Sequence, residues 1–104
     1  EPVLGYEVEV EALRRMLIEA FEQWVLVTKK VNSEVLQALK GQPDPGRVTD
    51  MIAGYLAVPL EEKQQLLELA NVQKRMHKLY EMLSKELEIA GLEKKYRSRS
   101  TQAN

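Results

Sequence analysis

The fold is decided by the last third of the chain, residues 72–99, which read VQKRMHKLYEMLSKELEIAGLEKKYRSR. Leu, Glu, Lys and Met dominate this stretch, and they are good helix formers because they lose little side-chain freedom in a helix. Asn71 stands just before it, where an amide side chain caps a helix. The stretch therefore predicts one long helix, longer than a domain of 104 residues needs for its own core.

Two apolar stripes run along this predicted helix. The first faces the other helices and comprises Val72, Met76, Leu79, Tyr80, Leu83, Leu87 and Ala90. The second comprises Met82, Ile89 and Tyr96, which recur every seven residues, with Leu92 near them. It lies roughly 110–150° around the helix from the first, at about 100° per residue. Either another helix of the bundle covers the second stripe, or it contacts another subunit, a downstream domain or a client protein.

Four shorter helical patterns precede the long one, over residues 11–31, 35–39, 45–56 and 60–69. The first has a wide apolar stripe, which is typical of a helix covered by several neighbours. Asn32 or Ser33 can cap the second helix, and Gly41 stops it. Asp44 and Pro45 form a strong start for the third. The chain is therefore predicted to be all-α, a compact bundle of about five helices with a long C-terminal helix.

The two ends of the chain differ from this helical body. Tyr6, Val8 and Val10 alternate with acidic residues, which is a strand period, so residues 1–10 are predicted to be an extended lead-in. Residues 11–99 form the α-helical subdomain. Residues 100–104 are polar and are expected to fray.

Composition excludes several classes of protein. The formal net charge is −1, with acids gathered in residues 1–11 and bases in residues 94–99, and Cys is absent. Disulfide frameworks and thiolate metal sites are therefore excluded. A nucleic-acid module is usually basic along one face, so we do not expect nucleic acid as a partner. No run of 18 apolar residues occurs, and acids stand where a signal peptide needs bases, so we expect a cytoplasmic protein without a membrane span.

No group of residues predicts catalysis. His77 is the only histidine and has Lys74, Arg75 and Lys78 near it, which would repel a metal ion. Ser84 and Lys85 are adjacent, and neighbours on a helix do not face one another. We therefore expect no catalytic, metal or cofactor site here, and the apolar helix faces favour an interaction module. The second stripe, with Met82, Ile89, Leu92 and Tyr96, is the candidate contact surface.

Several segments, in order and spacing, resemble the N-terminal domain of Lon, the ATP-dependent AAA+ protease. They read DPGRVTDMIA (residues 44–53), LEEKQQLLE (60–68), NVQKRM (71–76), KELEI (85–89) and EKKYRSR (93–99). The resemblance covers the α-helical second half of that domain. Pro59 replaces a hydroxyl cap that is common in the family, Asn71 stands where many members have Asp, and residues 100–104 depart from the basic helix that follows in the family.

The resemblance implies a non-catalytic substrate-recognition module, cut from a longer protein whose β-rich half lies upstream. Its partners would be unfolded or degron-bearing protein clients and other subunits of a homo-hexamer. ATP, Mg and the Ser–Lys dyad would belong to the rest of that protein. A structural spacer or oligomerisation element, linking client-binding and ATPase modules, is the alternative. A module unrelated to Lon, either an enzyme or a nucleic-acid binder, is the third reading.

Overall fold

The computed structural model describes residues 2–56 and 58–103, with side chains described for residues 7–56 and 58–97. Within these residues the chain forms five helices and no strand, as predicted. They are α1 (Pro2–Thr28), α2 (Ser33–Lys40), α3 (Pro45–Tyr55), α4 (Leu60–Glu68) and α5 (Val72–Ala103).

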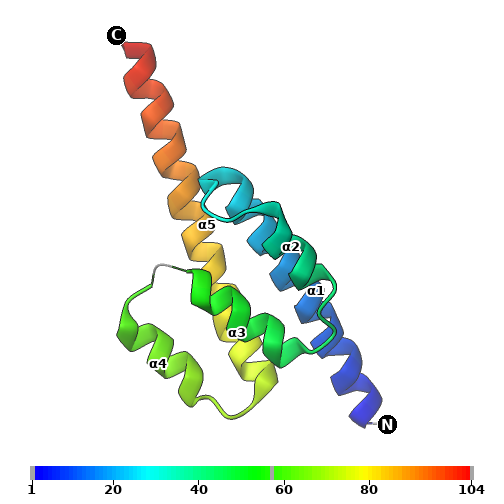
Figure 1. Ribbon diagram of the computed structural model, residues 1–104. Coiled ribbons are helices and arrows are strands. Elements are labelled where there is room, and N and C mark those ends of the chain that lie inside the picture. Colours follow the sequence, from blue (N-terminus) through cyan, green and yellow to red (C-terminus); the bar gives the residue numbers. More distant parts are fainter. Residues whose placement is uncertain (1, 57, 104) are drawn as a thin grey trace.

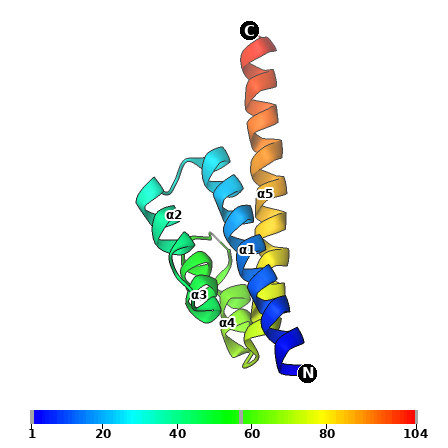
Figure 2. The same cartoon turned by 90° about the vertical axis from the view of Figure 1, so that its right-hand side faces the viewer.

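The two long helices, α1 and α5, lie side by side and run in the same direction, while α2, α3 and α4 pack on one side of this pair (Figure 1). The parallel direction follows from the contacts, since Glu9 lies beside His77 and the turn after α1 lies beside the second half of α5. The molecule measures 60 × 29 × 22 Å because α5 continues well past the other helices (Figure 2).

The centre of the core is the wide apolar face of α1, which contacts α2, α3 and α5 and so confirms its prediction. Phe21 is fully buried, and its ring lies 5.6 Å from the Trp24 ring and 5.9 Å from the Tyr55 ring. Burying a large aromatic side chain contributes on the order of 1.5–3 kcal/mol. The other buried apolar side chains of this cluster are Val10, Leu13, Leu17, Ile18, Val25, Leu36, Leu39, Val48, Ile52, Leu56, Leu66, Met76, Leu79 and Leu83.

Three helices begin at the polar side chains that the sequence predicts as caps. The Asn32 side-chain oxygen accepts a hydrogen bond from the Val35 amide at 3.2 Å, and Asp44 accepts one from the Gly46 amide at 2.9 Å. Asn71 accepts one from the Lys74 amide at 3.1 Å, at the start of α5. Each bond satisfies an amide that has no partner within its own helix.

Residues 2–10 are helical, so the predicted extended lead-in over residues 1–10 is wrong for all of it except Glu1, which lies outside the described residues. A strand would turn Val8 and Val10 to the same face, whereas Val8 is 66% exposed and Val10 is 8% exposed. Val10 continues the buried stripe of Leu13 and Leu17 at helical spacing. Extending a helix that has already nucleated costs little, so the pattern of α1 overrides the short alternation.

The far end of the chain is also more helical than predicted, because α5 runs to Ala103 instead of ending near Arg99. Residues 100–103 therefore continue the helix, and Asn104 lies outside the described residues. The polar residues do not stop the helix because neither Pro nor Gly interrupts it after residue 91.

Among the described residues, Lys29 ends a helix in the left-handed conformation, with a φ of 56°, and its amide donates to the Val25 carbonyl at 2.7 Å. Gly41 ends α2 as predicted, and it does so with right-handed backbone angles, with φ at −87°. Other residues adopt these backbone angles as readily as glycine does. The sharp turn that reverses the chain after α1 is therefore made by a lysine.

Candidate interaction surface on the last helix

The last helix has a packed half and a projecting half. Met76, Leu79, Leu83 and Ala90 are buried against the bundle. Among the described side chains of α5, Ala90 is the last that is buried, and all seven positions from 91 to 97 are exposed. At about 1.5 Å per residue, residues 91–103 extend roughly 20 Å past the last packed turn. Residues 91–97 therefore project from the bundle with exposed side chains, and the turn after α1 flanks them on one side.

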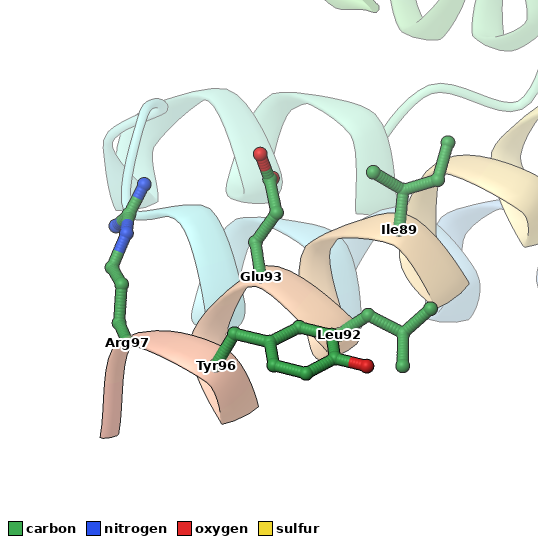
Figure 3. Close-up of a pocket in the computed structure, with 5 residues that line it drawn as sticks. All are labelled: Ile89, Leu92, Glu93, Tyr96 and Arg97. Atoms are coloured by element: carbon green, nitrogen blue, oxygen red, sulfur yellow. The ribbon is translucent and has the colours of Figure 1, made fainter. Parts of the chain in front are cut away.

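Three large apolar side chains share one side of α5 where it leaves the bundle. Ile89 is 42% exposed, Leu92 is 46% exposed and Tyr96 is 62% exposed. Figure 3 shows the Tyr96 ring lying along the helix in the direction of Leu92, with Ile89 one turn further back. We call these three residues the apolar face of α5.

The apolar face borders a shallow, open depression of about 510 Å³. Glu93 and Arg97 line it as well and project on the side of the helix away from Leu92 (Figure 3). All five residues belong to α5, so within the described part of the chain no other helix closes the depression. Spacings of three and four residues place these side chains next to one another on the helix surface.

Met82 does not belong to this exposed surface, so its candidacy as a contact residue needs correction. It is 6% exposed and lines a small depression together with Val58 and Glu62. The segment before α4 and α4 itself cover this side of α5 at the level of Met82 and leave it open at the level of Ile89. The seven-residue spacing places Met82, Ile89 and Tyr96 on one face of α5, but the bundle covers this face only at Met82.

The residues considered for catalysis stay apart. His77 is on the surface, with its Nε2 atom 3.4 Å from a carboxylate oxygen of Glu9. Ser84 and Lys85 are both exposed. In the described part of the chain, no three His, Asp or Glu side chains gather as a metal site would require. Among these residues, no nucleophile has a base within hydrogen-bond reach, as nucleophilic catalysis would require.

One carboxylate has a strongly altered acidity. Arg14 and Arg15 both donate hydrogen bonds of 2.9 Å to Glu11, and these bonds lower the pKa of its carboxyl to about 2. Arg14 also donates to the Gln42 carbonyl at 3.1 Å, so this cluster ties α1 to the segment between α2 and α3. Its role is structural, since it lies far along α1 from the apolar face of α5.

Sequence reasoning missed two surfaces that depend on how α1 and α5 pack. One is an apolar groove of about 250 Å³ between them, whose lining includes Met16, Ala20, Tyr80 and Leu87. The other is a basic groove beside the end of α1. Both require that α1 and α5 run parallel, and the sequence carries no signal for the relative direction of two helices that are distant along the chain.

None of the described helices is long and apolar enough to cross a membrane.

Comparisons with known proteins identify the family of this chain. A family model described as the ATP-dependent protease La (LON) substrate-binding domain matches residues 4–85. The Lon protease of Azospirillum brasilense is 37% identical over 95% of this chain, and the match covers 12% of that protein. The Lon proteases of Brevibacillus choshinensis and Desulforamulus reducens are 41% and 42% identical over 89% and 84% of the chain. The chain spans only 11–12% of the length of these relatives. The sequence resemblance is thereby confirmed, and the chain belongs to the Lon substrate-binding domain family.

Proposed function

We propose that this chain binds unfolded or degron-bearing polypeptide segments on behalf of a Lon-type protease and that the apolar face of α5 makes the contact. The observation that carries the proposal is the exposure of Ile89, Leu92 and Tyr96 beyond the packed bundle. Contiguous exposed apolar residues on a soluble domain mark interaction sites. The family description, a substrate-binding domain, supports the same role.

The chemistry of the surface suits a partner without fixed shape. The depression is open and shallow, so it does not require one complementary outline. An extended or helical client segment can lay apolar side chains along the face of a helix, as amphipathic peptides do in other complexes. Tyr96 adds a hydroxyl that can hydrogen-bond to the client backbone. The matched family region ends at Lys85, four residues before Ile89, so the proposal for this face rests on the geometry of this chain.

We extend the proposal to a longer, Lon-type protein of which this chain would be one part. That protein would be a homo-hexameric, ATP-dependent serine endopeptidase that uses ATP, Mg and a Ser–Lys dyad, all outside this chain. The support is the family description and the relatives' name, Lon protease. A cytoplasmic location stays a prediction.

The test is a titration of the chain, without ATP, against α-lactalbumin in two forms. One form is reduced and carbamidomethylated, which keeps it unfolded, and the other is native. We expect saturable binding of the unfolded form and none of the native form. Equal and negligible binding of both forms would refute client recognition by this chain.

Matched variants locate the contact. We expect binding of the unfolded form to weaken strongly in the triple variant Ile89→Ser, Leu92→Ser and Tyr96→Ser. Leu60→Ser with Leu67→Ser is the control, since these α4 side chains are 70% and 63% exposed and lie off the apolar face. If the control weakens binding as much as the triple variant, the contact is not confined to α5.

The second candidate function is a spacer or oligomerisation element, and the length of α5 favours it. A single helix of 32 residues in a molecule 60 Å long could hold two modules at a fixed separation. Sedimentation velocity separates the two candidates. Unchanged client affinity with an altered oligomer size in the triple Ser variant would favour the spacer.

A further inference from the structure

The end of α1 and the second half of α5 enclose a groove of about 400 Å³ in which positive charge accumulates. Its cationic lining residues are Lys29 and Lys30 from the turn after α1, and Lys94 and Arg97 from α5. Among the residues whose side chains are described, Glu93 is the acidic one that lines it. We call this depression the basic groove.

Helix dipoles account for only part of this charge. Lys29 and Lys30 follow the C-terminus of α1, where the negative end of the dipole favours cations. Lys94 lies in the interior of α5, nine residues before Ala103, and the dipole effect falls off within the last turn. Within the described residues, Lys29, Lys30 and Lys94 form no salt bridge. Bringing these like charges together from two elements leaves a surface that complements an anion.

The position of the basic groove indicates which class of anionic partner fits it, a polypeptide or a nucleic acid. It lies on the flank of α5 next to the apolar face, and Glu93 and Arg97 line both depressions. An α-helix is about 10 Å across, so an extended chain at about 3.3 Å per residue passes from one flank to the other in about three residues. A nucleic acid would leave the apolar face uncovered, and a chain with a net charge of −1 does not favour a polyanion as its partner.

We infer that the basic groove selects unfolded polypeptide segments that carry an Asp or Glu about three residues from a large apolar side chain. The apolar residue would lie on Ile89, Leu92 and Tyr96, and the carboxylate would lie between Lys30 and Lys94. This inference rests on the proposed function and adds a charge preference to it.

The experiment measures fluorescence anisotropy of two labelled, unstructured peptides that contain Phe and Leu. They differ only in having Asp or Asn three residues from each apolar residue. The Asp peptide should bind more tightly at low salt, and high salt should remove most of the difference. Lys30→Gln with Lys94→Gln should weaken the Asp peptide about three- to tenfold, as expected for two exposed charge pairs, and leave the Asn peptide unchanged.

The control is Lys74→Gln with Lys95→Gln, which removes the same charge from exposed positions of α5 outside the groove. It should leave both peptides unaffected, and equal weakening by this control would overturn the inference. Equal binding of the Asp and Asn peptides would overturn the inference while leaving client recognition intact. Absence of binding by both peptides would count against both. Tighter binding of single-stranded oligothymidine, lost in Lys30→Gln with Lys94→Gln, would show a phosphate site instead.

Discussion

Replacing Met82 by Ala should destabilise the chain, whereas the same change at Ile89 should not. The two residues lie seven positions apart on the same side of α5, but Met82 is 6% exposed and Ile89 is 42% exposed. Deleting a buried Met side chain costs about 2–5 kcal/mol, through lost apolar burial and the cavity left behind. Met82 lies at the margin of the core, beside Val58 and Glu62, so the lower end, about 2 kcal/mol, applies.

Urea unfolding followed by circular dichroism measures this difference directly. With a slope of about 2 kcal/mol per M urea, Met82→Ala should lower the unfolding midpoint by about 1 M. Ile89→Ala should change the free energy of unfolding by less than about 0.5 kcal/mol, as surface substitutions usually do. Equal losses in the two variants would refute the division of α5 into a packed half and a projecting half.

Three further predictions concern the backbone and the acid stability of the chain. Lys29→Gly should raise the unfolding midpoint, with a gain of about 0.5–1 kcal/mol, because glycine adopts the left-handed conformation without strain. Gly91→Ala should stabilise the projecting half of α5 by about 1 kcal/mol, since nothing lies within 4 Å of an added Cβ atom; slower amide hydrogen exchange over residues 92–97 would show it. Glu11 has its pKa lowered from 4.5 to about 2, so its ionised form stabilises the fold above pH 4.5 and this contribution disappears as the pH falls towards 2. Glu11→Gln should therefore unfold at lower urea than the unaltered chain near neutral pH and lose less stability over that acid range.

The sequence predicted the helices well wherever a polar cap and an apolar stripe agreed. Asn32, Asp44 and Asn71 each mark a helix start and make the expected hydrogen bond. These signals are local, because a cap depends on residues two or three positions away. The stop at Gly41 was also predicted correctly, but the first helix ends at Thr28 and not at Val31, with Lys29 in the left-handed conformation.

Of the four residues predicted as a contact surface, Ile89, Leu92 and Tyr96 are exposed and Met82 is buried, and their role in binding stays a prediction. The seven-residue spacing identified the face that carries Ile89 and Tyr96, and both are exposed. It could not show that α4 and the segment before it cover Met82, because that depends on packing between elements. The basic groove was beyond reach for the same reason, since Lys30 and Lys94 are 64 positions apart and meet only when α1 and α5 run parallel.

Client binding by the projecting half of α5 is tested most directly by an NMR titration of the isotopically labelled chain with an unstructured peptide that contains Phe and Leu. We expect the largest amide shift changes on residues 89–97, with little change over α4. Largest changes over α4, or over the groove between α1 and α5 around Met16 and Tyr80, would contradict the claim that the projecting half of α5 receives the client.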